Sequence, residues 1–163
     1  MSSTSNKVKL EIQKTYLAII NNSVGTKAFQ NFFISVNGKS IDIIKQGQLA
    51  CAFFVSNVCL TLNLIKQAHC TVQSTVQDLI KKGWVTVKKP HLGNILIWEA
   101  ITDTHGTHKH IGFYIGNNKA ISNSTRKGYP IIHHWTFGIK KGKPIRNIEM
   151  IWKYNFKKLF DGK

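Results

Sequence analysis

Two side chains that can act together as nucleophile and base lie far apart in this chain. Cys51 stands at the start of an apolar run, and His110 opens a strand-like segment at 110–116. A thiol becomes a strong nucleophile when a base can take its proton, and the free N–H groups at a helix start favour the thiolate. A lone cysteine more often only fills space in a core. Catalysis by Cys51 therefore depends on whether the fold brings His110 to it.

The size and charge of the chain limit what kind of protein it can be. Its 163 residues, 42% of them hydrophobic, predict one domain spanning 1–163 with a substantial core. Lys and Arg number 23 against seven Asp and Glu, and the resulting net charge of +16 favours anionic partners: nucleic acid, cell-wall polymer or acidic lipid headgroups. Because no motif with base-reading spacing is present, nucleic acid is not singled out. We expect a monomer.

The hydrophobic runs and the start of the chain bear on where the protein works. No run reaches the roughly 20 apolar residues that cross a bilayer, so no membrane span is expected. Residues 1–7 lack the apolar stretch of a signal peptide. The chain as written is expected to be cytoplasmic, with release or export by another route as the alternative.

The cysteine and histidine content gives little support to a disulfide framework or a metal site. The three cysteines are an odd number, so at least one thiol is free; Cys59 is expected in the core, and Cys70 follows the same helix. No C-x-x-C pair is present. Histidines gather at positions 105, 108 and 110 and again at 133 and 134, which leaves a metal site as a minor alternative. We expect neither a metal nor an organic cofactor.

Hydrophobic spacing predicts three helices. An amphipathic helix is expected over 7–22, and a helix that is apolar on nearly every side over 49–66. The second is expected to be central and buried, because it has no polar face to turn to water. A third helix is expected over 75–82, with Ser74 or Thr75 as its N-cap.

The remaining segments read as strands. Two runs flank Asn37-Gly38, the strongest short signal for a β-hairpin, at 32–36 and 39–44. A His- and Thr-rich loop is expected at 102–107. Further strands are expected at 84–87, 94–99, 109–115, 119–124, 129–135 and 145–154. With helices first and an antiparallel sheet after them, the chain is predicted to have an α+β fold.

Two segments of the chain resemble a known family of enzymes. The segment 93–98, GNILIW, resembles the Gly-Asp-apolar strand of NlpC-type cell-wall peptidases, and the segment 110–119, HIGFYIGNNK, resembles their His-apolar-Gly-apolar-Tyr-apolar-Gly hairpin. The broader relatives are the CHAP domains, cysteine- and histidine-dependent amidohydrolases. The resemblance covers roughly residues 49–124. It implies a papain-like fold, with N-terminal helices and a nucleophile at the start of a central helix packed on an antiparallel sheet.

The resemblance also implies an activity and its residues. Cys51 would be the nucleophile and His110 the general base in a cysteine amidase or peptidase that forms an acyl-enzyme. Bacterial cell-wall peptide, peptidoglycan, is the substrate class that it implies, with no cofactor. The enzymes of this family have a third polar residue on the next strand, which orients the imidazole.

The third residue of this site is either Asn123 or Ser122. If the turn at Asn117-Asn118 contains two residues, Asn123 lies opposite Gly112 and shares a face with His110. Its amide oxygen could then accept a hydrogen bond from the imidazole, so we expect a Cys51, His110, Asn123 triad. A bulge in either strand would place Ser122 there instead.

The chain departs from the family next to the nucleophile, and two rival functions stay open. The acidic residue before the cysteine and the serine after it are replaced by Ala50 and Ala52. A non-catalytic basic binding domain on the same scaffold is the first rival, because a fold alone does not determine activity. An acyltransferase that acts on lipid is the second, although such proteins usually have the His before the Cys.

Overall fold

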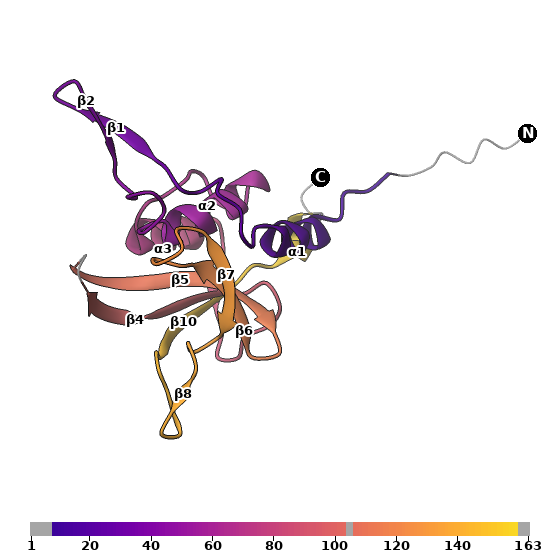
Figure 1. Cartoon of the computed structure of the whole chain (residues 1–163). Coiled ribbons are helices and arrows are strands. Elements are labelled where there is room, and N and C mark those ends of the chain that lie inside the picture. The colour runs from indigo at the N-terminus through magenta and orange to yellow at the C-terminus, as the bar shows by residue number, and fades with distance from the viewer. Residues whose placement is uncertain (1–7, 104–105, 160–163) are drawn as a thin grey trace, which may run out of the picture.

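The computed structural model describes residues 8–103 and 106–159, where helices pack on a mostly antiparallel sheet (Figure 1). The helices are α1 Ile12–Asn22, α2 Cys51–Thr61, α3 Val72–Lys81 and the short 3₁₀ helix η1 Phe156–Leu159. The strands are β1 Phe33–Val36, β2 Lys39–Asp42, β3 Val85–Thr86, β4 Ile95–Asp103, β5 Gly106–Gly116, β6 Lys119–Asn123, β7 Pro130–His134, β8 Ile139–Lys140, β9 Lys143–Pro144 and β10 Ile148–Lys153. The α+β class predicted from the sequence is confirmed.

The main sheet has six strands in the order β3-β10-β4-β5-β6-β7, and each neighbouring pair is antiparallel. The prediction of a loop over 102–107 is wrong, because β4 and β5 extend into this segment and Thr102 pairs with Thr107. The hydroxyls of these two threonines are 2.7 Å apart, which ties the strands together. The β8–β9 hairpin was not predicted, since strands of two residues are too short to show a pattern.

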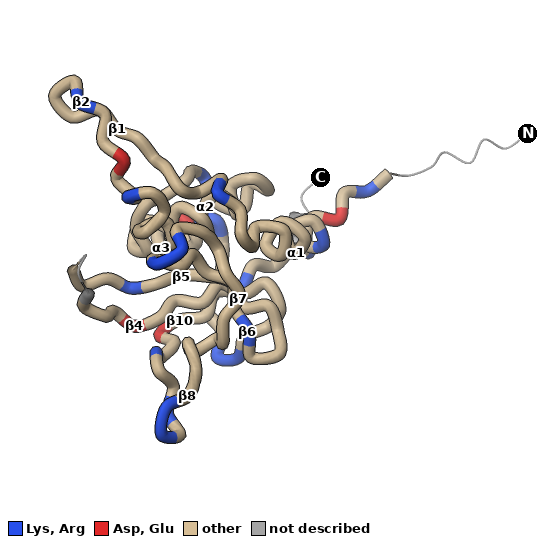
Figure 2. The backbone as a smooth tube through the Cα atoms, viewed as in Figure 1, with Lys and Arg blue, Asp and Glu red and all other residues tan. Residues whose placement is uncertain are grey.

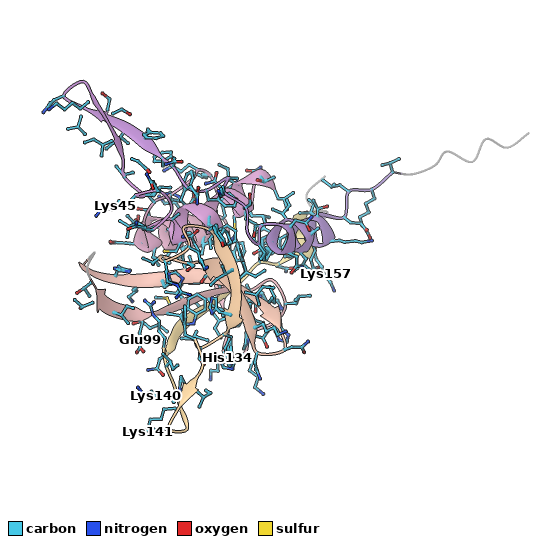
Figure 3. The ribbon with its side chains drawn as sticks, in the orientation of Figure 1. Lys45, Glu99, His134, Lys140, Lys141 and Lys157 are labelled. Atoms are coloured by element: carbon cyan, nitrogen blue, oxygen red, sulfur yellow. The ribbon has the colours of Figure 1, made fainter. Side chains whose placement is uncertain are left out.

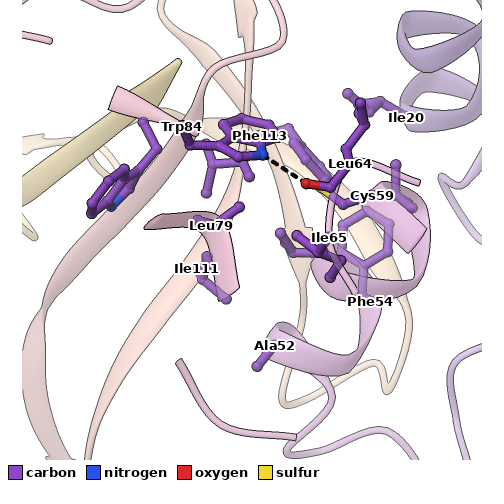
Figure 4. Packing of buried hydrophobic residues seen from close by; sticks show 14 of the residues in the cluster. Ile20, Ala52, Phe54, Cys59, Leu64, Ile65, Leu79, Trp84, Ile111 and Phe113 are labelled. Atoms are coloured by element: carbon purple, nitrogen blue, oxygen red, sulfur yellow. Dashed lines mark hydrogen bonds between the residues drawn. The ribbon is translucent and has the colours of Figure 1, made fainter. Parts of the chain in front are cut away.

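One face of the sheet carries the main core. Ile111 and Phe113 of β5 are fully buried in it, and Figure 4 shows Ile111 beside Leu79. The ring of Phe113 lies 5.8 Å from that of Tyr16 in α1 and 5.5 Å from that of Phe54 in α2. The indole N–H of Trp84 donates a hydrogen bond to the backbone oxygen of Leu64 at 2.9 Å, so this polar group is satisfied inside the core. Because α2 is packed on nearly all sides, its first residue is held in a defined position.

The helix boundaries differ from those expected. α2 ends at Thr61 rather than near residue 66, because Asn63 has a left-handed φ of 55°. α1 starts only at Ile12, since Val8 is exposed and has no core to pack against. α3 starts at Val72 because the hydroxyl of Thr71, rather than that of Ser74 or Thr75, caps it. Within the described ranges no helix has the length and apolar character needed to cross a bilayer.

The β1–β2 hairpin projects from the body of the protein just before the cysteine helix (Figure 1). Asn37 and Gly38 both have positive φ, 50° and 78°, as the predicted two-residue turn requires. At the base, the carboxylate of Asp42 accepts hydrogen bonds from the backbone N–H groups of Phe32 and Gln46. The segment that leads into α2 is therefore held by a carboxylate rather than left as an open loop.

A second carboxylate holds the segment between α2 and α3. Asp78 is only 5% exposed and accepts hydrogen bonds from the backbone N–H groups of Lys66 and Gln67, at 2.9 and 3.2 Å. Nε2 of His69 lies 2.9 Å from the same oxygen. Burial alone would raise the pKa of Asp78, but the hydrogen bonds from His69 and the two N–H groups outweigh it and lower this pKa.

We expect Asp78→Ala to lower the free energy of unfolding by about 3 kcal/mol, because it leaves buried donors without their acceptor. The pKa of Asp78 is lower in the folded chain than in the unfolded one. Its contribution is therefore complete above about pH 4 and is lost as the pH falls through the folded-state pKa. Urea unfolding at pH 7 and at pH 3 measures both effects. Glu11→Ala, which removes a carboxylate whose side chain is 68% exposed, is the control; equal losses in the two variants would contradict the assignment.

Candidate active site

Cys51 and His110 line the same cleft. It has a volume of about 680 Å³, and its walls come from α3, from the segment that precedes α2, and from β4 and β5. The two residues that the sequence singles out as nucleophile and base are thus brought to one solvent-accessible site. They come from a helix start and a strand, as expected.

The edge of β5 is open where the cysteine helix meets it. The pairing of β5 with β6 ends at Gly112 and Ser122, so Ile111 has no partner residue in β6. The side chain of Asn123, the next residue of β6, donates a hydrogen bond to the backbone oxygen of Gly47. This contact fixes the segment just before Cys51 at the end of β6. The start of α2 therefore lies against the open part of β5.

The thiol of Cys51 is protonated at rest. Burial raises its pKa, and the backbone N–H groups of Ile111 and Ala52 and the charge of Arg146 only partly oppose this. The sequence led us to expect that the helix start would favour the thiolate. The N–H group of Ala52 does lower the pKa, as that expectation requires, but desolvation outweighs it.

The imidazole of His110 belongs to a chain of hydrogen bonds that runs through Ser122 to His133. Its Nε2 lies 2.8 Å from the hydroxyl oxygen of Ser122, and that oxygen lies 2.7 Å from Nε2 of His133. Nδ1 of His133 lies 2.8 Å from the backbone oxygen of His134. Ser122 and His133 also line a second hollow of about 510 Å³, which His110 shares.

The last member of this chain determines the direction of all the hydrogen bonds. The backbone oxygen of His134 can only accept, so Nδ1 of His133 donates to it, and the bare Nε2 of the neutral ring must accept. The hydroxyl of Ser122 therefore donates to His133 and accepts from Nε2–H of His110. This leaves Nδ1 of His110 unprotonated and able to take a proton.

Both histidines are neutral at pH 7. Burial lowers the pKa of His110 well below its usual 6.5, and the nearby positive charge of Arg146 lowers it further. Burial likewise lowers the pKa of His133. The indole of Trp98 lies 5.5 Å from the ring of His110 and 5.7 Å from that of His133, and Phe137 stacks on His133 at 4.3 Å. Packing against these aromatic rings buries His110 and leaves His133 half-buried.

The hydrogen bond to His110 that was expected from Asn123 is made by Ser122 instead. The turn at Asn117-Asn118 pairs Gly116 with Lys119 as expected, but β5 then contains one extra residue between Tyr114 and Gly116. This bulge brings Ser122, rather than Asn123, opposite Gly112. Asn123 bonds to Gly47 and makes no described hydrogen bond to His110.

Gly112 allows Ser122 to come this close. A Cβ atom at residue 112 would lie 2.6 Å from the Cβ of Ser122 and 2.6 Å from the backbone oxygen of Ile121. Any larger residue would push the two strands apart beside His110. The glycine of the His-apolar-Gly pattern is therefore needed for packing across to Ser122.

His133 is the residue that sequence reasoning missed. The pattern places it on a later strand but does not tell which strand lies beside β6. In the structure β7 pairs with β6, and His133 stands opposite Ala120, diagonally across from Ser122. The rule that successive strands usually lie side by side, applied to β6 and β7, could have found His133.

The other residues considered from the sequence lie away from this chemistry or remain without a role. Cys59 is fully buried in the core, as expected, whereas Cys70 lines the cleft. His108 lines the cleft and the second hollow, and His105 lies outside the described residues. Among the described residues no group of three or more His, Cys, Asp or Glu could hold a metal ion.

The positive charge is spread over the protein rather than concentrated at the cleft. Figure 2 shows basic residues at the tip of the β1–β2 hairpin, along α1 and at the β8–β9 turn. Lys140 and Lys141 extend from that turn in Figure 3, on the opposite side of the sheet from Lys45. This distribution is that of a generally basic surface.

Comparison with known proteins does not identify a family for this chain. No family model matches the chain, and no curated protein matches it. The resemblance described above rests on the residues of this chain.

We expect His110 at pH 7 to be the neutral tautomer that carries its proton on Nε2. Two-bond ¹⁵N–¹H NMR spectra of the imidazole measure this directly, because protonated and bare ring nitrogens have distinct shifts. Ser122→Ala removes the acceptor and should give a mixture of tautomers, whereas Ser124→Ala, on the adjoining segment, should change nothing. A proton on Nδ1 of His110 in the unaltered protein would refute the hydrogen-bond direction.

Proposed function

We propose that this chain is a cysteine amidase or peptidase of papain-like fold, in which Cys51 attacks an amide carbonyl. One observation carries the proposal: Cys51 lines the same cleft as a neutral His110 whose proton-accepting Nδ1 is left bare by the Ser122–His133–His134 chain. The position of Cys51 at the start of α2, with His110 on β5 in the same cleft, supports this pairing. Ser122 and His133 are positioning residues in this proposal, because they orient His110 and touch no substrate.

The reaction would proceed in two halves. The sulfur of Cys51 bonds to the carbonyl carbon while its proton passes to Nδ1 of His110, and backbone N–H groups at the start of α2 stabilise the oxyanion. The C–N bond then breaks, and His110 returns the proton to the leaving amine. In the second half His110 takes a proton from water and the resulting hydroxide attacks the thioester carbonyl. The carbon–sulfur bond then breaks, the carboxylic acid leaves, and His110 returns its proton to the sulfur of Cys51.

The substrate class has less support than the reaction, because it depends on the resemblance to a family from which the chain departs beside Cys51. The resemblance of segments 93–98 and 110–119 to NlpC-type peptidases points to a bacterial cell-wall peptide as substrate. Ala50 and Ala52 replace polar residues of that family, and neither is needed for the proton transfer, which uses Nδ1 of His110. The proposal therefore commits to amide hydrolysis first and to peptidoglycan second.

A basic binding domain is the second candidate, because the net charge of +16 favours any polyanion. Such binding would use the spread lysines and would weaken steeply with added salt. It would make no demand on Cys51 or His110. The reactivity of the cysteine therefore separates the two candidates.

We expect the rate of hydrolysis to fall far more when Cys51 or His110 is replaced than when a neighbouring residue is replaced. Purified peptidoglycan and a mixed peptide pool are incubated with the protein, and new amino termini are identified by mass spectrometry. Cys51→Ala should abolish cleavage, His110→Ala should slow it about a hundredfold or more, and Ser122→Ala about tenfold. Cys59→Ala in the core and Ser124→Ala serve as controls. Equal cleavage by Cys51→Ala and the unaltered protein would end the proposal.

The alkylation of Cys51 by iodoacetamide should be nearly independent of pH from about 6.5 to 9.0. His110 is already neutral there because its pKa lies below 6.5, and the thiol is still protonated because its pKa lies above 9.0. In His110→Ala the reaction needs free thiolate, so its rate should rise about tenfold per pH unit. Peptide mapping gives the rate for each cysteine. Equal slow labelling of Cys51, Cys59 and Cys70 would instead support the binding domain.

A further inference from the structure

The walls of the cleft beside Cys51 carry little charge in a very basic protein. Lys109 is the one Lys, Arg, Asp or Glu among the described residues that line it, and its ammonium group pairs with Glu149. The whole chain contains 23 Lys and Arg. The hollow on the other side of His110, in contrast, includes Arg126 and Arg146. The cleft is therefore distinct from the surface around it.

Helix α3 supplies one wall of the cleft, and its residues form two stripes. Val72 and Val76 are one turn apart and half-buried, so they present branched apolar side chains toward the cleft. Gln73 and Gln77 are also one turn apart and are exposed along its rim. Each glutamine amide can donate and accept hydrogen bonds, as a peptide backbone needs.

The remaining surfaces of the cleft match this wall. Ile97 of β4 and Met150 of β10 add apolar side chains, and Leu49, two positions before Cys51 in the chain, lines the cleft as well. A charged substrate group placed here would lose water and find no free opposite charge among these residues, which is costly. Burying a branched apolar group here would instead be favourable, because apolar surface is removed from water.

We infer that the acyl group accepted by Cys51 carries an uncharged, branched apolar side chain, which lies against Val72 and Val76 while Gln73 and Gln77 bind the flanking peptide bonds. This inference rests on the proposed function and names the substrate class of the same site. Polyanions, which the net charge attracts, would contact the outer surface rather than this cleft.

Dipeptidyl fluoromethyl ketones test the inference, because they alkylate a catalytic cysteine at a rate that depends on the residue beside the reactive carbonyl. Four probes carry Val, Gln, Glu or Lys there, and mass spectrometry gives the rate of labelling at Cys51. The Val probe should react at least about tenfold faster than the Glu and Lys probes. Val76→Ala should reduce this preference by removing apolar contact.

A charge placed on the cleft wall provides the matched comparison. Gln77→Lys adds a cation at an exposed position of the rim and should accelerate the Glu probe relative to the Val probe. Ile80→Lys adds the same charge on α3 outside the cleft, at a residue that is 57% exposed, and should leave the selectivity unchanged. This pair separates a local effect from a change in net charge.

The outcomes distinguish the inference from the function on which it rests. If Cys51 reacts with the probes but prefers Glu or Lys, or treats all four alike, the inference is overturned while the nucleophile stands. Equal selectivity changes in Gln77→Lys and Ile80→Lys would overturn it as well. If no probe labels Cys51 faster than Cys70, the proposed function itself fails.

Discussion

The site depends on one hydroxyl group that joins two histidines. Ser122 accepts from His110 and donates to His133, and the backbone oxygen of His134 determines both directions. A hydroxyl can do this because it donates one hydrogen bond and accepts others at the same oxygen. An amide or carboxylate in the same place would also hold the imidazole. What differs here is that a second imidazole, that of His133, determines the direction in which the hydroxyl donates and accepts hydrogen bonds.

In this arrangement two neutral side chains, Ser122 and His133, orient the imidazole of His110, a role that a charged carboxylate could otherwise have. The aromatic rings of Trp98 and Phe137 pack against the two histidines and limit their contact with water, so a carboxylate there would be costly to bury. Burial lowers the pKa of His110, so its imidazole is neutral at pH 7. Burial also keeps Cys51 protonated, so the resting pair is a thiol and an imidazole rather than an ion pair.

The sheet and helices bring the pair together through a break in strand pairing. β6 stops pairing with β5 at Ser122, and Asn123 then fastens the segment before Cys51 to the end of that strand. The asparagine expected to touch the imidazole is therefore important for a different reason, because it positions the start of α2. Asp78 and Asp42 hold the segments on either side of the cysteine helix.

The sequence by itself determined the α+β class, the position of Cys51 at a helix start, the strand that carries His110 and the hairpin at Asn37-Gly38. Those features follow from local periodicity and turn chemistry, which act between near neighbours. Only the tertiary structure decided between Ser122 and Asn123, brought His133 next to Ser122, and set the burial that raises the pKa of Cys51. A bulge of one residue changes which side chains face each other, and desolvation depends on the packing of distant segments, so neither can be read from local pattern.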